Sequence, residues 1–184
     1  MDFYSFFKLL HVISAIAWVG GGLTLLASAI FNVRDHGPAE AIRAAQSMGS
    51  LAMRWFLPAS GLTLVFGIIT TFLGNLWGEA WVILGLIGFA ATFLTGHFGM
   101  RVKSIRMGEL MKQGREDEAV AEGLSLLRVG KFDYTVILLV VAAMVLKPVW
   151  TDFVTIGAFA AILVAVAAYV IFIEPYRSHP IPAE

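Results

Sequence analysis

Cysteine is absent from this chain. Its absence excludes disulfide bonds, thiolate metal ligands and cysteine nucleophiles, and it leaves histidine, methionine, carboxylate, hydroxyl and amide groups for any chemistry. Charge is also scarce, because Asp, Glu, Lys and Arg make up only 14% of the residues and balance to a formal net charge of zero. No large basic block stands outside the predicted loops, so we expect no nucleic acid partner.

Several catalytic patterns are missing as well. The sequence has no Ser-His-Asp grouping, no glycine-rich phosphate-binding loop and no pair of carboxylates within an apolar segment. Hydrolase and ATPase functions therefore have no residues to support them. Internal repeats and low-complexity tracts are absent too, so residues 1–184 are predicted to form a single membrane domain.

Apolar residues dominate the chain, at 59% of its 184 residues. The predicted fold class is all-α, a polytopic membrane bundle of five transmembrane helices. A helix needs roughly 20 apolar residues to cross a bilayer, and five segments qualify: about 4–31, 51–73, 80–100, 132–146 and 153–173. Pro58 should kink the second span, and the fourth can extend backward through 119–129. Loops are expected at 32–50 and at 101–131, the latter as a solvated helical hairpin broken near Gly114.

Lysine and arginine are distributed unevenly between the two sides of this bundle. Three lie in or beside the first loop, seven in the loop at 101–131 and one in the C-terminal tail, which leaves only Lys8 and Lys147 for the other side. The positive-inside rule then places the N-terminus outside and the C-terminus in the cytoplasm. We expect a multi-pass protein of the bacterial inner membrane, with the lipid bilayer as its main partner.

The stretch from Lys8 to Gly22 carries more polar and small residues than a membrane anchor needs. Residues three and four apart share a helix face, and this spacing aligns the following side chains: Lys8, His11, Ser14 or Ala15, Trp18 and Gly22. Gly21 and Gly22 permit a flat group or a neighbouring helix to approach closely. A haem fits this description, because its iron accepts an imidazole and Lys8 can neutralise a propionate. A structural histidine bonded to a neighbouring helix is the equal alternative.

A second candidate ligand, His97, stands near the cytoplasmic end of the third predicted span. His11 and His97 are then separated by something like 20 Å across a core of ~30 Å, so one iron cannot take both as axial ligands. Two sites, another partner for one histidine, or two copies of one histidine in a symmetric dimer remain open. Asp133 is expected to pair with Arg54, Arg101 or Lys131 at the inner interface.

The sequence Lys8-Leu-Leu-His-Val-Ile-Ser-Ala-Ile-Ala-Trp-Val-Gly-Gly21 resembles the first span of bacterial predicted integral membrane proteins of unknown function. It is also similar to the first spans of CopD-type and HemJ-type proteins, and the likeness continues in Arg54-Trp-Phe-Leu-Pro58. The resemblance implies a protein associated with haem b or a metal, with His11 as the ligand. Leu84, Gly85 and Leu86 stand where HemJ-type proteins have a functional lysine, which counts against protoporphyrinogen oxidation.

Three functions follow as hypotheses. The first is binding of haem b or a similar redox or metal cofactor through His11, with Lys8, Trp18, Gly21, Gly22 and His97 as further site residues, for electron transfer or an oxidase. The second is a small transporter or permease component for copper or a small solute. The third is an accessory subunit or homodimer without chemistry of its own. The sequence leaves open whether the protein is an enzyme.

Overall fold

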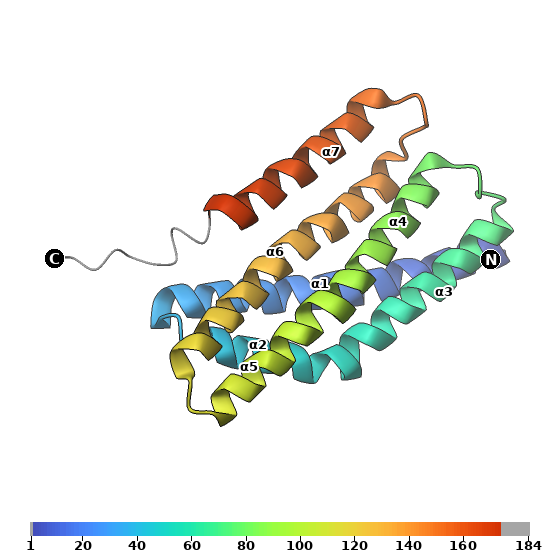
Figure 1. The fold of residues 1–184 in the computed structure, drawn as a ribbon. Coiled ribbons are helices and arrows are strands. Elements are labelled where there is room, and N and C mark those ends of the chain that lie inside the picture. Colours follow the sequence, from blue (N-terminus) through green and yellow to red (C-terminus); the bar gives the residue numbers. More distant parts are fainter. Residues whose placement is uncertain (1, 174–184) are drawn as a thin grey trace.

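The computed structural model describes residues 2–173, apart from the side chains of His97 and Ile173. Over this range the secondary structure is helical, without strands, and five helical segments are long and apolar enough to cross a membrane. The prediction of an all-α, multi-pass membrane protein with five spans is therefore confirmed. Three of the five segments include a π-helical turn, so the spans are built from these elements (Figure 1): α1 Phe3–His36; α2 Glu40–Leu51, η1 Ala52–Phe56 and α3 Leu57–Leu73; α4 Ala80–Leu94, η2 Thr95–Met100 and α5 Arg101–Lys112; α6 Glu116–Leu146; α7 Phe153–Ala168 and η3 Tyr169–Ile173.

The first helix begins and ends at residues with clear capping roles. The Asp2 carboxylate accepts a hydrogen bond from the Ser5 backbone N–H at 2.7 Å, which satisfies one of the free amides of the first turn. The helix ends at Gly37, whose φ of 99° is strained for residues that have a side chain. Helix α1 therefore runs five residues past the expected span end at 31.

A π-helical turn precedes Pro58, where a kink was expected. The Leu57 N–H bonds to the Ala52 carbonyl, five residues back, so η1 contains one more residue per turn than an α-helix. Pro58 has no N–H, and in an α-helix its ring would crowd the carbonyl of Arg54. The chain continues from α2 through this wider turn into α3 without a loop.

The helices pack in two closely contacting pairs, and the long helix α6 belongs to one of them (Figure 1). Helix α1 packs along α3, and α4 packs along α6. Helices α2 and α5 cover the first half of α6, and α7 lies at the edge of the bundle, where α6 is its main contact. Helix α7 has no buried residue, as expected for an apolar helix surrounded largely by lipid.

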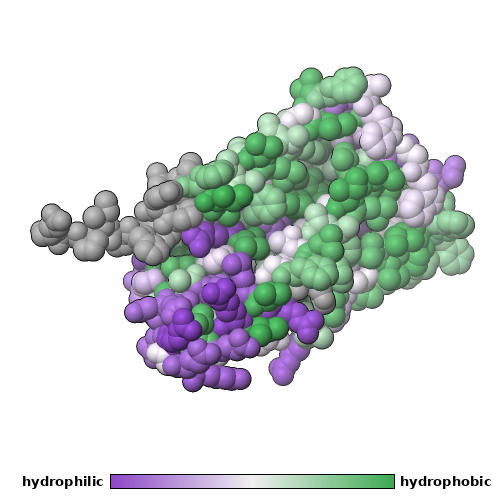
Figure 2. Space-filling model, viewed as in Figure 1, coloured by the Kyte–Doolittle hydropathy of each residue, from purple (hydrophilic) through white to green (hydrophobic). Residues whose placement is uncertain are grey.

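At one end of the bundle the helices extend into a polar region with two small cores of its own. Figure 2 shows hydrophilic residues gathered there. One core contains Ala45, Met107, Leu110, Ala119 and Leu126; the other contains Leu26, Ala29, Ala41 and Leu127. At Gly123 an added Cβ would lie 3.1 Å from the Ala41 backbone, so α2 and α6 approach closely.

The segments 32–50 and 101–131 are therefore mostly packed helices in the structure. The hairpin at 101–131 does turn at Gly114, whose φ is +70°. Its α6 arm is fastened to α5 by Glu122, whose carboxylate oxygens lie 3.1 Å from Arg106 Nε and 3.5 Å from Lys103 Nζ. Helix α6 begins 16 residues before the expected fourth span, because its first half has these partners to bury its apolar face.

The opposite end of the bundle is closed by contacts between its two turns. Trp150 donates a hydrogen bond from Nε1 to the Gly78 carbonyl at 3.2 Å. The Lys147 ammonium lies 5.3 Å from the centre of the Trp81 ring, a cation–π contact. Both exposed indoles at this end, Trp77 and Trp150, suit a membrane interface.

Candidate functional site

His11 is held against helix α3 by a hydrogen bond to its backbone. The His11 Nδ1 atom lies 2.8 Å from the Thr63 carbonyl oxygen. A carbonyl oxygen only accepts, so Nδ1 carries the proton in this contact, and in a neutral imidazole the Nε2 atom then presents a lone pair. A hydrogen bond from one ring nitrogen to a backbone carbonyl is the arrangement that orients many metal-binding histidines.

The imidazole reaches the backbone of α3 because Gly67 leaves room for it. A Cβ added at Gly67 would lie 3.0 Å from both Nδ1 and Cε1 of His11, closer than such contacts normally are. Thr63 directs its own hydroxyl to the Ala59 carbonyl at 2.8 Å, so its side chain does not compete for the histidine. The ring orientation is therefore set by α3 as much as by α1.

The other residues of the predicted stripe face different neighbours. Trp18 packs edge-on against Phe89 of α4, with ring centres 5.4 Å apart. A Cβ at Gly21 would lie 2.9 Å from Nε1 of Trp55, and one at Gly22 would overlap the hydroxyl of Tyr134. The space beside these two glycines is thus filled by side chains from η1 and α6.

These two side chains also bond to the backbone of α1. Trp55 Nε1–H donates to the Ala17 carbonyl at 3.1 Å, and the Tyr134 hydroxyl donates to the Val19 carbonyl at 3.1 Å. Such contacts fix three helices around the middle of α1. They are helix-to-helix polar bonds of the same kind as the bond from His11 to Thr63, which is the contact expected of a structural histidine.

Lys8 lies outside the bundle, on the same end as His11. Its side chain is exposed, and its ammonium lies 5.8 Å from the centre of the Tyr4 ring. Lys8 and His11 are one helical turn apart, so the ammonium is available for an anionic group near that end.

His97 belongs to the π-helical turn η2, far from His11 along the helix axes. Gly67 lies at the same depth in the bundle as His11. It is six residues from the end of α3, a distance of about 9 Å along the helix axis at 1.5 Å per residue. His97 is 17 residues from the start of α4 at the same end, or about 26 Å. The two backbones therefore differ in depth by about 17 Å, as the expected separation of these histidines requires.

Asp133 is the most deeply buried charged side chain that sequence reasoning placed at an interface. It is 8% exposed, and among the described residues its Oδ1 atom has no hydrogen-bond partner. Neither Arg54 nor Arg101, two of the three expected partners, forms an ion pair with it. Asp133 lies 13 residues from Leu146, about 20 Å, so a bilayer core of ~30 Å that begins there encloses it.

The position of Asp133 follows from the neighbours of α6. A Cβ added at Gly99 would lie near Val129, and one added at Gly88 would lie near Val136 and Val140. This side of α6 therefore faces α4 and η2. Asp133 shares this side, while Tyr134 and Gly130 face α1. The amphipathic pattern in 119–129, through which the fourth span was expected to extend backward, continues α6 and moves Asp133 from the start of a span into the helix.

Among the described residues, no group of three or more His, Asp and Glu side chains is close enough to hold a metal ion. His11 therefore offers one ligand from one side. Comparison with known protein families, characterised proteins and solved structures finds no match to this chain. The site residues alone carry the functional argument.

Proposed function

We propose that this protein binds haem b, or a similar redox or metal cofactor, through Nε2 of His11, and serves electron transfer or an oxidase. The observation that supports this proposal is the 2.8 Å contact between His11 Nδ1 and the Thr63 carbonyl. It selects the tautomer that ligates through Nε2, and the packing against Gly67 holds the ring still.

His11 would supply a single imidazole ligand to such a cofactor. Bound haem supplies the one-electron chemistry, and its potential depends on the axial ligand and on burial. His11 orients through α3, and exposed Lys8 provides a cation for a carboxylate at the same end. Because Trp55 and Tyr134 fill the space over Gly21 and Gly22, a cofactor on His11 would have to lie away from these two glycines.

We also propose how the protein is oriented and in which membrane it lies. The polar end carries ten of the twelve described Lys and Arg residues, and the other end has Lys8 and Lys147. The positive-inside rule supports a cytoplasmic polar end and an outer N-terminus in a bacterial inner membrane. His11 and its cofactor then belong to the outer leaflet.

The visible spectrum tests the proposal. The protein, purified in mild detergent from cells supplied with haem, should show a Soret band that shifts when dithionite is added. His11→Ala should abolish this band, and Gly67→Ala should change its position or intensity because the added methyl displaces the imidazole. His36→Ala is the matched control, since His36 is exposed in the last turn of α1. A colourless wild-type protein refutes haem binding.

Transport is a second candidate, and Asp133 is the observation that favours it. Carboxylates inside a membrane bundle are costly and mark ion or proton pathways in many transporters. The buried threonines Thr63, Thr70, Thr71 and Thr92 add hydroxyls to the interior, although three of them bond to their own helices.

Proteoliposomes that contain an internal pH indicator test this second function. Wild-type protein should equilibrate an imposed pH gradient faster than empty vesicles, and Asp133→Asn should abolish the difference. Glu118→Gln is the control, since Glu118 is exposed and pairs with Arg115 in the polar region. Equal rates for wild-type protein and empty vesicles count against proton movement.

A further inference from the structure

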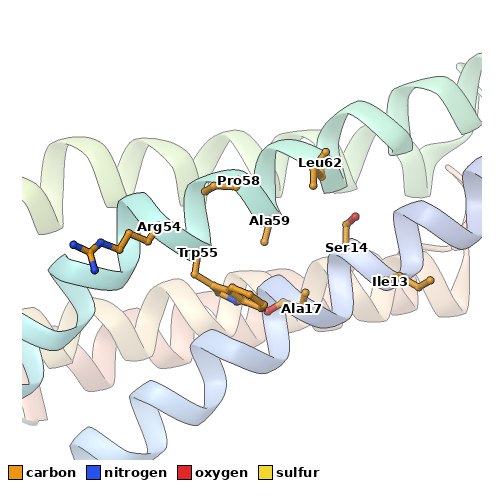
Figure 3. A pocket seen from close by; sticks show the side chains of 8 residues that line it. All are labelled: Ile13, Ser14, Ala17, Arg54, Trp55, Pro58, Ala59 and Leu62. Atoms are coloured by element: carbon orange, nitrogen blue, oxygen red, sulfur yellow. The ribbon is translucent and has the colours of Figure 1, made fainter.

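A groove of about 350 Å³ lies between α1 and the η1–α3 segment, outside the His11 site. Figure 3 shows its side chains, which come from both helices. They are Ile13, Ser14, Ala17, Arg54, Trp55, Pro58, Ala59 and Leu62. All are apolar except Ser14 and Arg54. Several lie on the outer surface, since Ile13 is 53% and Leu62 48% exposed.

Arg54 stands at one end of this groove, as Figure 3 shows, and at one boundary of the apolar layer. Residues 55–73 carry no charge, and at 1.5 Å per residue they span about 28 Å, close to the ~30 Å core of a bilayer. The guanidinium is therefore level with lipid headgroups, while the rest of the groove runs into the acyl-chain region.

The Arg54 guanidinium has no counter-charge of its own in the described part of the chain. Its side chain is exposed, and none of the ion pairs formed by the described arginines includes it. Arg54 shares this with the exposed Arg34 and Arg101, whereas Arg43, Arg106 and Arg115 each pair with a glutamate. Guanidinium groups bind phosphate oxygens through two parallel N–H bonds.

The groove walls suit the remainder of a lipid. The Trp55 indole is fixed by its bond to the Ala17 carbonyl, so it forms a rigid apolar side at headgroup depth. Ser60 and Thr63 bond to carbonyls of their own helix, whereas the Ser14 hydroxyl forms no hydrogen bond with the described residues.

We propose that this groove is a binding site for one anionic phospholipid, with the phosphate on Arg54 and an acyl chain along Ala17, Ala59 and Leu62. Charge complementarity selects the anionic headgroup, and the apolar walls select a lipid over a free phosphate. A zwitterionic lipid also offers a phosphate, but its ammonium or choline group lies against the same cation. This site does not depend on cofactor binding at His11.

Native mass spectrometry of the delipidated protein in neutral detergent tests the site. Phosphatidylglycerol should bind with one tight stoichiometric site, and phosphatidylcholine more weakly. Arg54→Gln should reduce the affinity for phosphatidylglycerol roughly five- to tenfold, and Arg54→Lys should have an intermediate effect because it retains the charge but not the two-point contact. Inorganic phosphate at the same concentrations should not displace the lipid.

Two further variants separate this site from general attraction of anions to the polar end. Arg34→Gln removes an exposed arginine of α1 outside the groove and should leave the affinity unchanged. Ala17→Leu fills the groove without a change of charge and should weaken binding as much as Arg54→Gln does. Equal losses in Arg34→Gln and Arg54→Gln, or equal affinity for the two lipids, would overturn the proposal.

Discussion

Replacement of Gly22 by alanine should disrupt the contact between α1 and α6. The added methyl would lie 2.7 Å from Cζ of Tyr134 and would overlap its hydroxyl oxygen. A tyrosine ring is rigid, so the whole side chain must move, and its hydrogen bond to the Val19 carbonyl breaks. The substitution therefore combines overpacking with the loss of a polar contact between helices.

The size of the effect follows from three contributions. Overpacking costs about 1–3 kcal/mol, and the lost interhelical hydrogen bond costs about 0.6–1.7 kcal/mol in a membrane protein. Alanine is favoured over glycine inside a helix by up to about 1 kcal/mol. The net loss in the free energy of unfolding should be about 1–4 kcal/mol.

Gly20→Ala is the matched control, because a Cβ at Gly20 meets nothing within 4 Å. The two variants share the gain in helix propensity, so it cancels when they are compared. Gly22→Ala should therefore be less stable than Gly20→Ala by about 2–5 kcal/mol. Reversible unfolding in mixed micelles with increasing dodecyl sulfate, followed by circular dichroism, measures both values.

A second substitution checks the mechanism. Tyr134→Phe removes the hydroxyl that the methyl would overlap, so Gly22→Ala should cost less in that background than in the wild type. Equal stability of the Gly20 and Gly22 variants, or fully additive effects of the Gly22 and Tyr134 substitutions, would refute this account of the contact.

Two other predictions concern α6 and α7. Gly88→Ala, on the face of α4 that meets α6, should lower the free energy of unfolding by about 1–3 kcal/mol, because its methyl would overlap Val140. The control Gly61→Ala should not lower it, because a Cβ at Gly61 meets nothing within 4 Å. Thermal unfolding in detergent compares the two variants. Hydrogen bonds from the side chain and the backbone amide of Thr155 lower the pKa of the Asp152 carboxyl, which caps α7. The cap stabilises α7 at pH values above the ordinary carboxyl pKa, and this stabilisation is lost as the pH falls through the lowered pKa of Asp152. Amide hydrogen exchange in the first turn of α7 should therefore accelerate in that acidic range. Asp152→Asn should show no such acceleration.

Sequence patterns predicted the membrane class and the five spans because these depend on hydrophobic length alone. A helix must be long enough to cross the core, and few polar residues are tolerated within it, so composition along the chain is sufficient. The helix ends were less accurate. Segments 119–129 and 32–36 continue α6 and α1 because Leu26, Ala41 and Leu127 from distant parts of the chain form a core at the polar end.

The role of the glycines in α1 shows a second limit. The sequence indicates that Gly21 and Gly22 allow a close neighbour, and in the structure each has one. It does not say which one, because a flat cofactor and a side chain from another helix need the same space. Trp55 and Tyr134, 34 and 112 positions further along, take it in the fold.

The sequence by itself determined that this protein is a five-helix membrane bundle with an asymmetric distribution of charge, since both follow from residues counted along the chain. Only the tertiary structure decided that His11 bonds to the backbone of α3 beside Gly67, that Asp133 faces the interior, and that Arg54 stands at one end of a groove of about 350 Å³ between α1 and α3. Each of these depends on which face of a helix meets which neighbour. Hydrophobic length does not specify that choice, because lipid and protein cover an apolar helix face equally well.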